Sequence, residues 1–373
     1  MPPFNPIVAA LPATVPFVGP ETQERARGRS FLARLGANES VFGPAPAVRA
    51  AVARAADEAW AYGDPEAFEL RNALSALTGA APERITVGSG IDGLLGVAAR
   101  LFAGHGDAVV TSLGGYPTFS YHVDGLGARR VSVPYRDDRE DWEGLAAAAR
   151  AERARIVYIA NPDNPMGTVW PAQAICDLRA ALPEDCMLFL DEAYLDFAPE
   201  GTAPEFPADD PGVIRFRTFS KAYGLAGLRV GYALSAPEIA CGFDKLRNHF
   251  GVGRVAQAGA LAALGAQDWL AEVVAQVARG RSRLALIAEE NGLAAIPSAT
   301  NFAAIDCGGD GEFARAVLRE VVARDVFIRM PGVAPLDRCI RVSVGTEADL
   351  DLFADVLPQA LAAAKAGRGR NAP

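Results

Sequence analysis

The sequence predicts an α/β protein in which a large, mostly parallel seven-stranded sheet is joined to a smaller α+β domain. Seven short segments beyond residue 84 are rich in apolar residues, and most lack the polar/apolar alternation of a half-exposed strand. Helical stretches lie between most of them, as expected for strands that are covered on both faces. After about residue 245 this alternation stops and a long Ala-rich helical region begins, which indicates a second domain.

The expected strands of the large sheet are 85–87, 108–111, 130–133, 156–159, 187–190, 213–216 and 228–233. Expected helices include 45–59, 66–77, 94–101, 144–152 and 172–181. The later part predicts a helical region at 254–290, strands at 302–305, 326–329 and 340–344, and helices at 312–323 and at the C-terminus. Residues 1–40 are rich in proline and indicate an extended arm. We therefore expect a large domain at 41–245 and a small domain at 246–373 that carries the arm 1–40.

Composition excludes several classes of protein. The 373 residues carry a net charge of -9 and no basic run in the body of the chain, which argues against a nucleic-acid partner. Five scattered cysteines form neither a CxxC pair nor a metal-ligand spacing, so we expect reduced thiols, no metal site and a cytoplasmic location. No apolar run reaches the roughly 18 residues of a membrane span, and no signal peptide is evident.

Lysine is scarce in this chain, and Lys221 stands in an unusual place. Only three of the 36 basic residues are lysines, and Lys221 follows the apolar segment 213–219 among small and apolar residues. Burial lowers the pKa of a lysine and makes its amine available as a nucleophile or Schiff-base partner. A partly buried lysine that only packs its stem explains this stretch equally well, so the motif alone leaves both interpretations open.

Polar groups follow five of the expected strands. In a parallel α/β sheet, ligands bind beyond the carboxyl ends of the strands. These ends carry the glycine-rich turn 88–93, Tyr116, Asn164, the segment from Asp191 to Tyr194, and Ser220-Lys221 with Arg229. Each has an ordinary alternative as a turn, a helix cap or a packed ring. Together they provide an amine, an acid, phenols, an amide and an anion site, which suits an anionic aromatic aldehyde, pyridoxal phosphate.

With these residues in this order, the chain resembles the class I and II aminotransferases of fold type I, and among them the histidinol-phosphate aminotransferase group. The resemblance extends over nearly the whole chain, from Asn38-Glu39 and Tyr62-Gly63-Asp64-Pro65 to Arg341-Val342-Ser343-Val344-Gly345. Its most specific motifs are Asn161-Pro162, Asp191-Glu192-Ala193-Tyr194 and Ser220-Lys221-Ala222 followed by Arg229, in this order.

The resemblance implies a homodimeric, pyridoxal-phosphate-dependent aminotransferase. Lys221 is then the residue that forms the aldimine and afterwards moves the proton between the substrate Cα and the cofactor. Asp191 pairs with the pyridinium nitrogen, while Asn164 and Tyr194 hydrogen bond to the ring oxygen. Tyr116 stacks on the ring, with Phe119 as the weaker candidate. The implied phosphate site consists of Ser89, Gly90, Ile91, Thr218, Ser220 and Arg229, with Tyr62 reaching the cofactor of the neighbouring subunit. Arg341, with Arg329 and Asn38, is implied to bind the substrate.

The chain departs from the family pattern at four places. Ile91 stands where relatives usually have a hydroxyl residue, and Asp163 and Met166 replace the first Asn and the Thr of the usual motif. Pro16-Phe17 stands where histidinol-phosphate enzymes tend to have Pro-Tyr, whose hydroxyl helps to bind the substrate phosphate. The resemblance implies histidinol phosphate as donor and 2-oxoglutarate as acceptor, whereas the loss of this hydroxyl favours an amino acid carboxylate. The open alternatives are an aromatic or other amino acid as donor, and a decarboxylase or lyase of the same fold. A nucleotide-binding dehydrogenase is set aside because residues 88–93 lack the G-x-G-x-x-G spacing.

Overall fold

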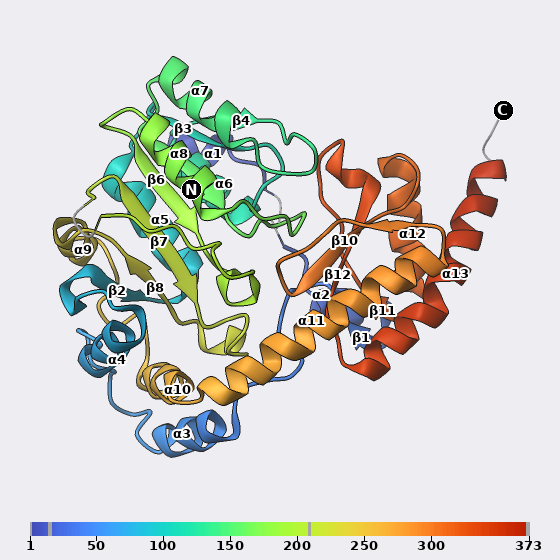
Figure 1. The fold of residues 1–373 in the computed structure, drawn as a ribbon, viewed down its shortest axis with the longest axis horizontal. Coiled ribbons are helices and arrows are strands. Elements are labelled where there is room, and N and C mark those ends of the chain that lie inside the picture. Colours follow the sequence, from blue (N-terminus) through green and yellow to red (C-terminus); the bar gives the residue numbers. More distant parts are fainter. Residues whose placement is uncertain (1, 14–16, 208–209, 371–373) are drawn as a thin grey trace.

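A seven-stranded sheet forms the centre of the larger of two lobes in this computed structural model, which describes residues 2–13, 17–207 and 210–370 (Figure 1). Its strands are β2 (Ile85–Gly88), β3 (Ala108–Ser112), β4 (Arg129–Val133), β5 (Ile156–Ala160), β6 (Met187–Asp191), β7 (Val213–Thr218) and β8 (Gly231–Leu234). Their order across the sheet is β2-β8-β7-β6-β5-β3-β4. Only β8 runs antiparallel to its neighbours, which confirms the predicted mostly parallel sheet.

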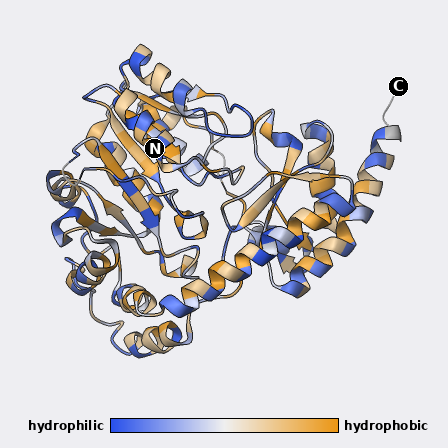
Figure 2. Cartoon of the chain, viewed as in Figure 1, coloured by the Kyte–Doolittle hydropathy of each residue, from blue (hydrophilic) through white to orange (hydrophobic). Residues whose placement is uncertain are grey.

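Helices cover both faces of this sheet, as the uninterrupted apolar strands predicted. The helices are α5 (Gly90–Phe102), α6 (Pro117–Gly125), α7 (Trp142–Glu152), α8 (Ala172–Ala181) and α9 (Pro237–Asp244). Alternate residues of β5 separate into two hydrophobic clusters. Ile156 and Tyr158 pack with residues of α5, α6 and α9, whereas Val157 and Ile159 pack with α7 and α8. Figure 2 shows the resulting predominantly hydrophobic strands between helices that alternate in polarity.

The smaller lobe contains an antiparallel sheet in the order β12-β10-β9, formed by Cys339–Ser343, Phe302–Asp306 and Ala294–Ala295. Helices α12 (Gly311–Ala323) and α13 (Glu347–Arg370) pack against it with α11 (Gln267–Glu290). The N-terminal segment joins this lobe, because β1 (Ala33–Arg34) pairs in parallel with β11 (Val326–Phe327). Before β1 lie α1 (Pro6–Ala10) and α2 (Pro20–Arg27).

Several expectations differ from the structure. The arm 1–40 was expected to be extended, but it contains the helices α1 and α2. The strand expected to begin at residue 228 begins at Gly231, because Ala226–Leu228 is a 3₁₀ turn and Arg229 has a left-handed backbone with φ 54°. The helical region 254–290 is two helices that are interrupted at residues 265–266, α10 (Arg254–Leu264) and α11.

Helix α10 packs against α3 (Pro46–Ala56) and α4 (Phe68–Thr78) on the larger lobe, whereas α11 extends to the smaller lobe (Figure 1). A domain boundary at residue 245 would separate α10 from the helices that it contacts. The division into 41–245 and 246–373 therefore stays a prediction. Within the described part of the chain, no helix combines the length and the apolar character needed to cross a bilayer.

Gly280 allows α11 to approach the end of β12 closely. An added Cβ atom would overlap with Cγ1 of Val344, which follows β12 directly. Because β12 carries Arg341, this contact helps to set the position of a predicted substrate-binding residue.

We expect Gly280→Ala to destabilise the protein by about 1–3 kcal/mol through overpacking, which exceeds the roughly 0.5–1 kcal/mol that alanine usually contributes over glycine in a helix. Chemical denaturation measures the change. Gly367→Ala is the control, because Gly367 lies in α13 with no atom within 4 Å of an added Cβ. A Gly280→Ala protein as stable as the wild type would contradict the expected overlap.

Candidate active site

Lys221 lies at the carboxyl end of the sheet, three residues beyond β7, and is half-buried. Its Nζ donates a hydrogen bond of 3.1 Å to the backbone oxygen of Asn38. The same nitrogen lies 5.5 Å from the centroid of the Tyr194 ring. The predicted amine is therefore held beside the predicted phenol, by a residue of the N-terminal arm.

Asn38 is a buried junction between the two lobes. Its backbone has φ 55°, a left-handed conformation that asparagine tolerates better than most residues. Its Nδ2 donates to the Tyr194 hydroxyl at 3.0 Å, and its N–H donates to Oγ of Ser343 at 3.0 Å. The Asn38 carbonyl accepts from Nδ2 of Asn301 at 3.0 Å as well as from Lys221. These bonds leave Asn38 in a positioning role between Lys221 and the smaller lobe.

Asp191 ends β6 and is 4% exposed. It accepts hydrogen bonds from the Tyr158 hydroxyl at 2.7 Å and from the N–H of Ala193 at 3.0 Å. Burial raises the pKa of the Asp191 carboxyl to about 6, and these two bonds limit the rise. Phe119 is fully buried and stacks on Tyr158 with ring centroids 4.3 Å apart. Phe119 thus supports the partner of Asp191 and has no exposed face for a ligand.

The predicted phosphate site gathers at the N-terminus of α5. Gly90, the first residue of the helix, has φ 76°, and Ser89 provides no side-chain capping bond. An added Cβ at Gly90 would lie 2.5 Å from a terminal nitrogen of Arg229. Arg229 donates to Oγ of Ser220 at 3.3 Å, and Oγ1 of Thr218 donates to the same oxygen at 3.0 Å. Helix amides, two hydroxyls and a guanidinium therefore converge, as an anion requires.

Tyr116 lies beside this anion site. Its hydroxyl donates to Asp92 at 2.7 Å, and the other oxygen of Asp92 lies 3.4 Å from Arg229. Burial and the Asp92 carboxylate raise the pKa of Tyr116 far above its ordinary value, so the phenol stays protonated. The side chain of Ile91 packs in the hydrophobic cluster below, which leaves only its backbone N–H for a phosphate.

Arg341 and Asn164 meet directly. One terminal nitrogen of Arg341 donates to Oδ1 of Asn164 at 2.6 Å, and the other donates to the carbonyl of Gly36 at 3.3 Å. Its Nε is buried without a partner among the described atoms. Asn164 also donates to the Tyr194 hydroxyl at 3.5 Å. Within the described residues Arg341 forms no ion pair, so its charge stays available to an anionic substrate.

Arg329 is placed differently from Arg341. The two backbones form a β-bridge, but a terminal nitrogen of Arg329 donates to the carbonyl of Val18 at 3.0 Å. The guanidinium lies 3.7 Å from the ring centroid of Phe17. Burial, together with repulsion from Arg341, lowers the pKa of Arg329 to about 10, so it remains charged at neutral pH. Pro16, singled out with Phe17 in the sequence, lies outside the described residues.

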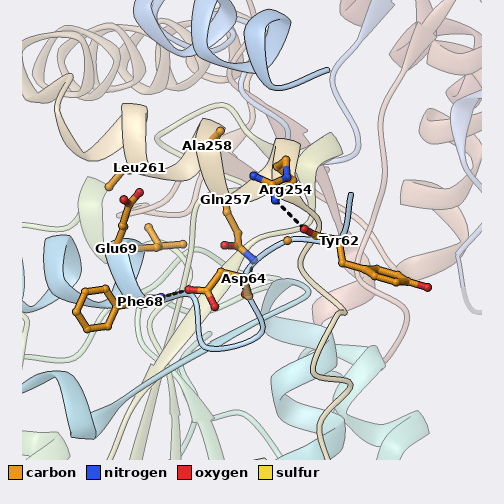
Figure 3. A pocket seen from close by; sticks show the side chains of 10 residues that line it. Tyr62, Asp64, Phe68, Glu69, Arg254, Gln257, Ala258 and Leu261 are labelled. Atoms are coloured by element: carbon orange, nitrogen blue, oxygen red, sulfur yellow. Dashed lines mark hydrogen bonds between the residues drawn. The ribbon is translucent and has the colours of Figure 1, made fainter. Parts of the chain in front are cut away.

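Tyr62 is not part of this cluster in a single chain. Its side chain is 77% exposed and packs on Phe250, with ring centroids 4.7 Å apart. It borders a cavity of about 520 Å³ lined by residues of α4 and α10, including Phe68 and Gln257. Figure 3 shows the Tyr62 ring pointing away from the other lining residues. The cavity is lined by none of the residues that surround Lys221, and so does not mark the candidate site.

The side chains fit pyridoxal phosphate. The amine of Lys221 lies beside the Tyr194 ring, and the buried carboxyl of Asp191 has no cation bonded to it in the part of the chain that the structure describes. The amides of Gly90 and Ile91 open α5 without a side-chain cap, at a position where a Cβ atom would meet Arg229. No group of three or more metal-ligating side chains occurs in the described ranges.

Three contributors to the site were not predicted from the sequence: Tyr158, Asn301 and Ser343. Tyr158 lies inside an apolar strand, where a phenol is usually a core residue, and only its place three residues before Asn161-Pro162 hinted at function. Asn301 and Ser343 flank or end strands of the smaller lobe, and no motif connects them with Asn38.

Comparisons with known proteins agree with this geometry. The family model for aminotransferases of class I and II matches residues 32–357. Histidinol-phosphate aminotransferase 2 of Ralstonia nicotianae is 34% identical over 342 residues, which cover 90% of each chain. The crystal structure of histidinol-phosphate aminotransferase from Sinorhizobium meliloti with pyridoxal-5'-phosphate is 54% identical, has a TM-score of 0.93, and covers 96% of this chain and 97% of that one. Aspartate aminotransferase from Thermus thermophilus, 21% identical, has the same fold with a TM-score of 0.81 and covers 97% of this chain and 100% of the other.

Tyr158→Phe removes the hydrogen bond to Asp191, the residue expected to pair with the cofactor's ring nitrogen. We expect cofactor binding to weaken about 10- to 100-fold, because a hydrogen bond to a charged group contributes about 1.5–3 kcal/mol. Without the Tyr158 hydroxyl the pKa of Asp191 rises above about 6, so the loss is larger near pH 6–7 than near pH 8–9. Absorbance titration with the cofactor measures the affinity at each pH.

Tyr121→Phe is the control for this change, because Tyr121 lies on α6 and is 40% exposed. A Tyr158→Phe protein whose cofactor affinity varied with pH as in the wild type would show that the hydroxyl does not tune Asp191.

Proposed function

We propose a donor and an acceptor for this chain, which belongs to the class I and II aminotransferase family: histidinol phosphate and 2-oxoglutarate. The chain is a fold-type-I aminotransferase with pyridoxal phosphate as its cofactor. The observation that carries the choice of donor is the 54% identity with the Sinorhizobium meliloti histidinol-phosphate aminotransferase over nearly the full length of both chains. This relationship supports histidinol phosphate as the donor. The arginines at the site supply the positive charge that an anionic donor requires.

Lys221 is the residue that we assign to covalent binding of the cofactor and to proton transfer. When bound, pyridoxal phosphate supplies a carbonyl group for the donor's amine and a ring that withdraws electrons from the donor's Cα. The Nζ of Lys221, held by the Asn38 carbonyl at 3.1 Å, is the base that removes the proton from Cα. The acceptor half of the reaction runs these proton transfers in reverse.

The remaining residues would orient the cofactor. Asp191 would supply a negative charge to the ring nitrogen, since its pKa of about 6 leaves it mainly ionised at neutral pH. Asn164 and Tyr194 provide donors for the ring oxygen, and Tyr116 supplies a stacking face. The amides and hydroxyls around Arg229 hold the phosphate.

Arg341 is the residue that we assign to the donor's anionic end. Among the described residues, its guanidinium hydrogen bonds only to the neutral oxygens of Asn164 and Gly36. A second positive charge is carried by Arg329, whose backbone pairs with that of Arg341 in a β-bridge. The Arg329 guanidinium lies over the ring of Phe17. Two guanidiniums at one site favour a donor with a doubly charged phosphate.

An amino acid with an aromatic side chain is the second candidate donor. The observation that favours it is Phe17, which has no hydroxyl to offer a phosphate and places its ring on Arg329 at 3.7 Å. A decarboxylase or lyase of the same fold remains a further alternative, because the residues around Lys221 would support loss of carbon dioxide as well as proton transfer.

The donor is tested by adding single amino donors to the cofactor-loaded protein and following the bound cofactor by absorbance. We expect rapid conversion with histidinol phosphate and at least about 100-fold slower conversion with phenylalanine and tyrosine, because the phosphate adds charge-assisted bonds of about 1.5–3 kcal/mol each. Lys221→Ala should convert donor at least about 10³-fold more slowly, since the base is removed.

Preference for phenylalanine over histidinol phosphate would overturn the proposed donor and support the second candidate. Release of carbon dioxide without need for a keto acid would support a decarboxylase. Phe17→Tyr further distinguishes the two candidate donors. The added hydroxyl should strengthen binding of a phosphorylated donor and leave binding of phenylalanine unchanged.

We also propose that the chain works as a homodimer in the cytoplasm. Trp60, Tyr62, Phe68 and Phe250 expose 50–88% of their surface in one region of the larger lobe. Large exposed aromatic residues indicate an interface. A second subunit that covers these residues would place Tyr62 of the first subunit next to the anion site of the second. All five cysteines are free thiols, which suits a reducing compartment.

Tyr62→Phe should weaken cofactor binding about tenfold through loss of one hydrogen bond to phosphate. Mixing this variant with Lys221→Ala distinguishes a shared site from a separate one. A hybrid dimer contains one site with both Lys221 and Tyr62 only if Tyr62 acts on the partner's site. Recovery of tight binding with donor turnover supports the proposal, whereas mixing without recovery places Tyr62 in its own subunit's site.

A further inference from the structure

Two buried carboxyl groups lie near Asn164, one in the same loop and one before α7. Glu140 precedes α7, Asp163 lies in the loop after β5, and each is 2% exposed. Neither forms an ion pair with an arginine, lysine or histidine in the described part of the chain. Buried acids without a cation normally stay neutral or act in a site, because an isolated buried charge is strongly unfavourable.

Neutral donors occupy both carboxyl groups. Glu140 accepts from the Ser112 hydroxyl at 2.6 Å and from the N–H of Ala160 at 3.1 Å. Asp163 accepts from the Tyr135 hydroxyl at 2.7 Å and from the N–H of Met166 at 2.9 Å. The two acids thus hold the ends of β3 and β5 and the turn that follows β5.

The pair has room for one proton. Burial raises the pKa of both carboxyls, and the charge on Asp163 raises that of Glu140 further. The interaction between the two carboxyls favours the proton on Glu140 and the charge on Asp163. The other titratable groups that face them are Tyr135 and Tyr158, whose pKa values are raised by burial, and Arg341, whose charge favours an ionised Asp163.

These acids are connected to the candidate site through the backbone. Asp163 directly precedes Asn164, and its carbonyl accepts from the N–H of Gly167 at 3.2 Å, which closes the turn. Ala160, bonded to Glu140, lies opposite Asp191 in the sheet, and the N–H of the next residue donates to the Asp191 carbonyl at 2.8 Å. A shift of this segment would therefore move Asn164 away from Arg341.

We propose that Glu140 and Asp163 act as positioning residues that share one proton and thereby hold Asn164 against Arg341. The inference rests on the roles proposed above for Asn164 and Arg341. Glu140 then carries the proton and Asp163 the negative charge. Loss of the shared proton at high pH places two repelling charges in the same buried space, displaces the loop and weakens binding of the amino donor.

Glu140→Gln is the decisive variant, because glutamine keeps the shape and a donor but cannot ionise. A folded-state pKa above the unfolded value means that Glu140 contributes stability fully below about pH 4, and that this stability is lost as pH rises through the raised pKa. The melting temperature of Glu140→Gln should therefore rise relative to the wild type by at least about 2 °C between about pH 5 and pH 9. Thermal unfolding with and without cofactor measures this shift and uses no amino donor.

The positioning role is tested by the KM of the amino donor. In the wild type KM should increase at least threefold at high pH while kcat changes less, and Glu140→Gln should lack this increase. Asp163→Asn removes the charge that repels an ionised Glu140. The changes in melting temperature and KM that follow the titration of Glu140 should therefore occur at lower pH. Glu143→Gln, an exposed glutamate of α7, is the control and should follow the wild type.

Two outcomes would overturn the proposal. Glu140→Gln that follows the wild type in both the melting temperature and the KM profile would show that no proton is shared. A changed melting profile with an unchanged KM profile would show that the pair supports the fold without positioning Asn164. Because the KM profile can be measured with whichever donor the absorbance screen identifies, an error in the proposed donor does not affect either result.

Discussion

The hydrogen bonds of the buried Asn38 are the constraint on which the rest of the site depends. This one residue bonds to Lys221 and Tyr194 of the larger lobe and to Asn301 and Ser343 of the smaller lobe. Its carbonyl accepts from both lobes, its side-chain amide donates to Tyr194, and its N–H donates to Ser343. The two lobes are thereby joined at the residues of the candidate site.

The elements that the sequence predicted well share one physical property. Parallel strands buried on both faces consist of uninterrupted apolar residues, so polar residues become conspicuous where each strand ends. Asp191, Asn164 and Ser220-Lys221 were found in this way, and the structure brings them together because parallel strands end on the same edge of the sheet. Their chemistry then pointed to one kind of cofactor.

The features that escaped prediction depend on tertiary contacts. Tyr158 has the same local environment as a core tyrosine, and only its approach to Asp191 gives it a role. Glu140 reads as an ordinary loop acid until the fold buries it beside Asp163. The late start of β8 follows from the left-handed backbone of Arg229, which a strand-like run of residues conceals. Propensity describes neighbours along the chain, whereas these properties arise from neighbours in space.

The bond of 2.6 Å between Arg341 and Asn164 has a thermodynamic consequence. Asn164 also bonds to Tyr194, so the same amide belongs to the surroundings of both the proposed substrate anion and the proposed cofactor oxygen. Two ligands that depend on the position of one side chain are linked, and linkage is reciprocal. The factor by which the cofactor changes the affinity for an anion at Arg341 must therefore equal the factor by which that anion changes the affinity for the cofactor.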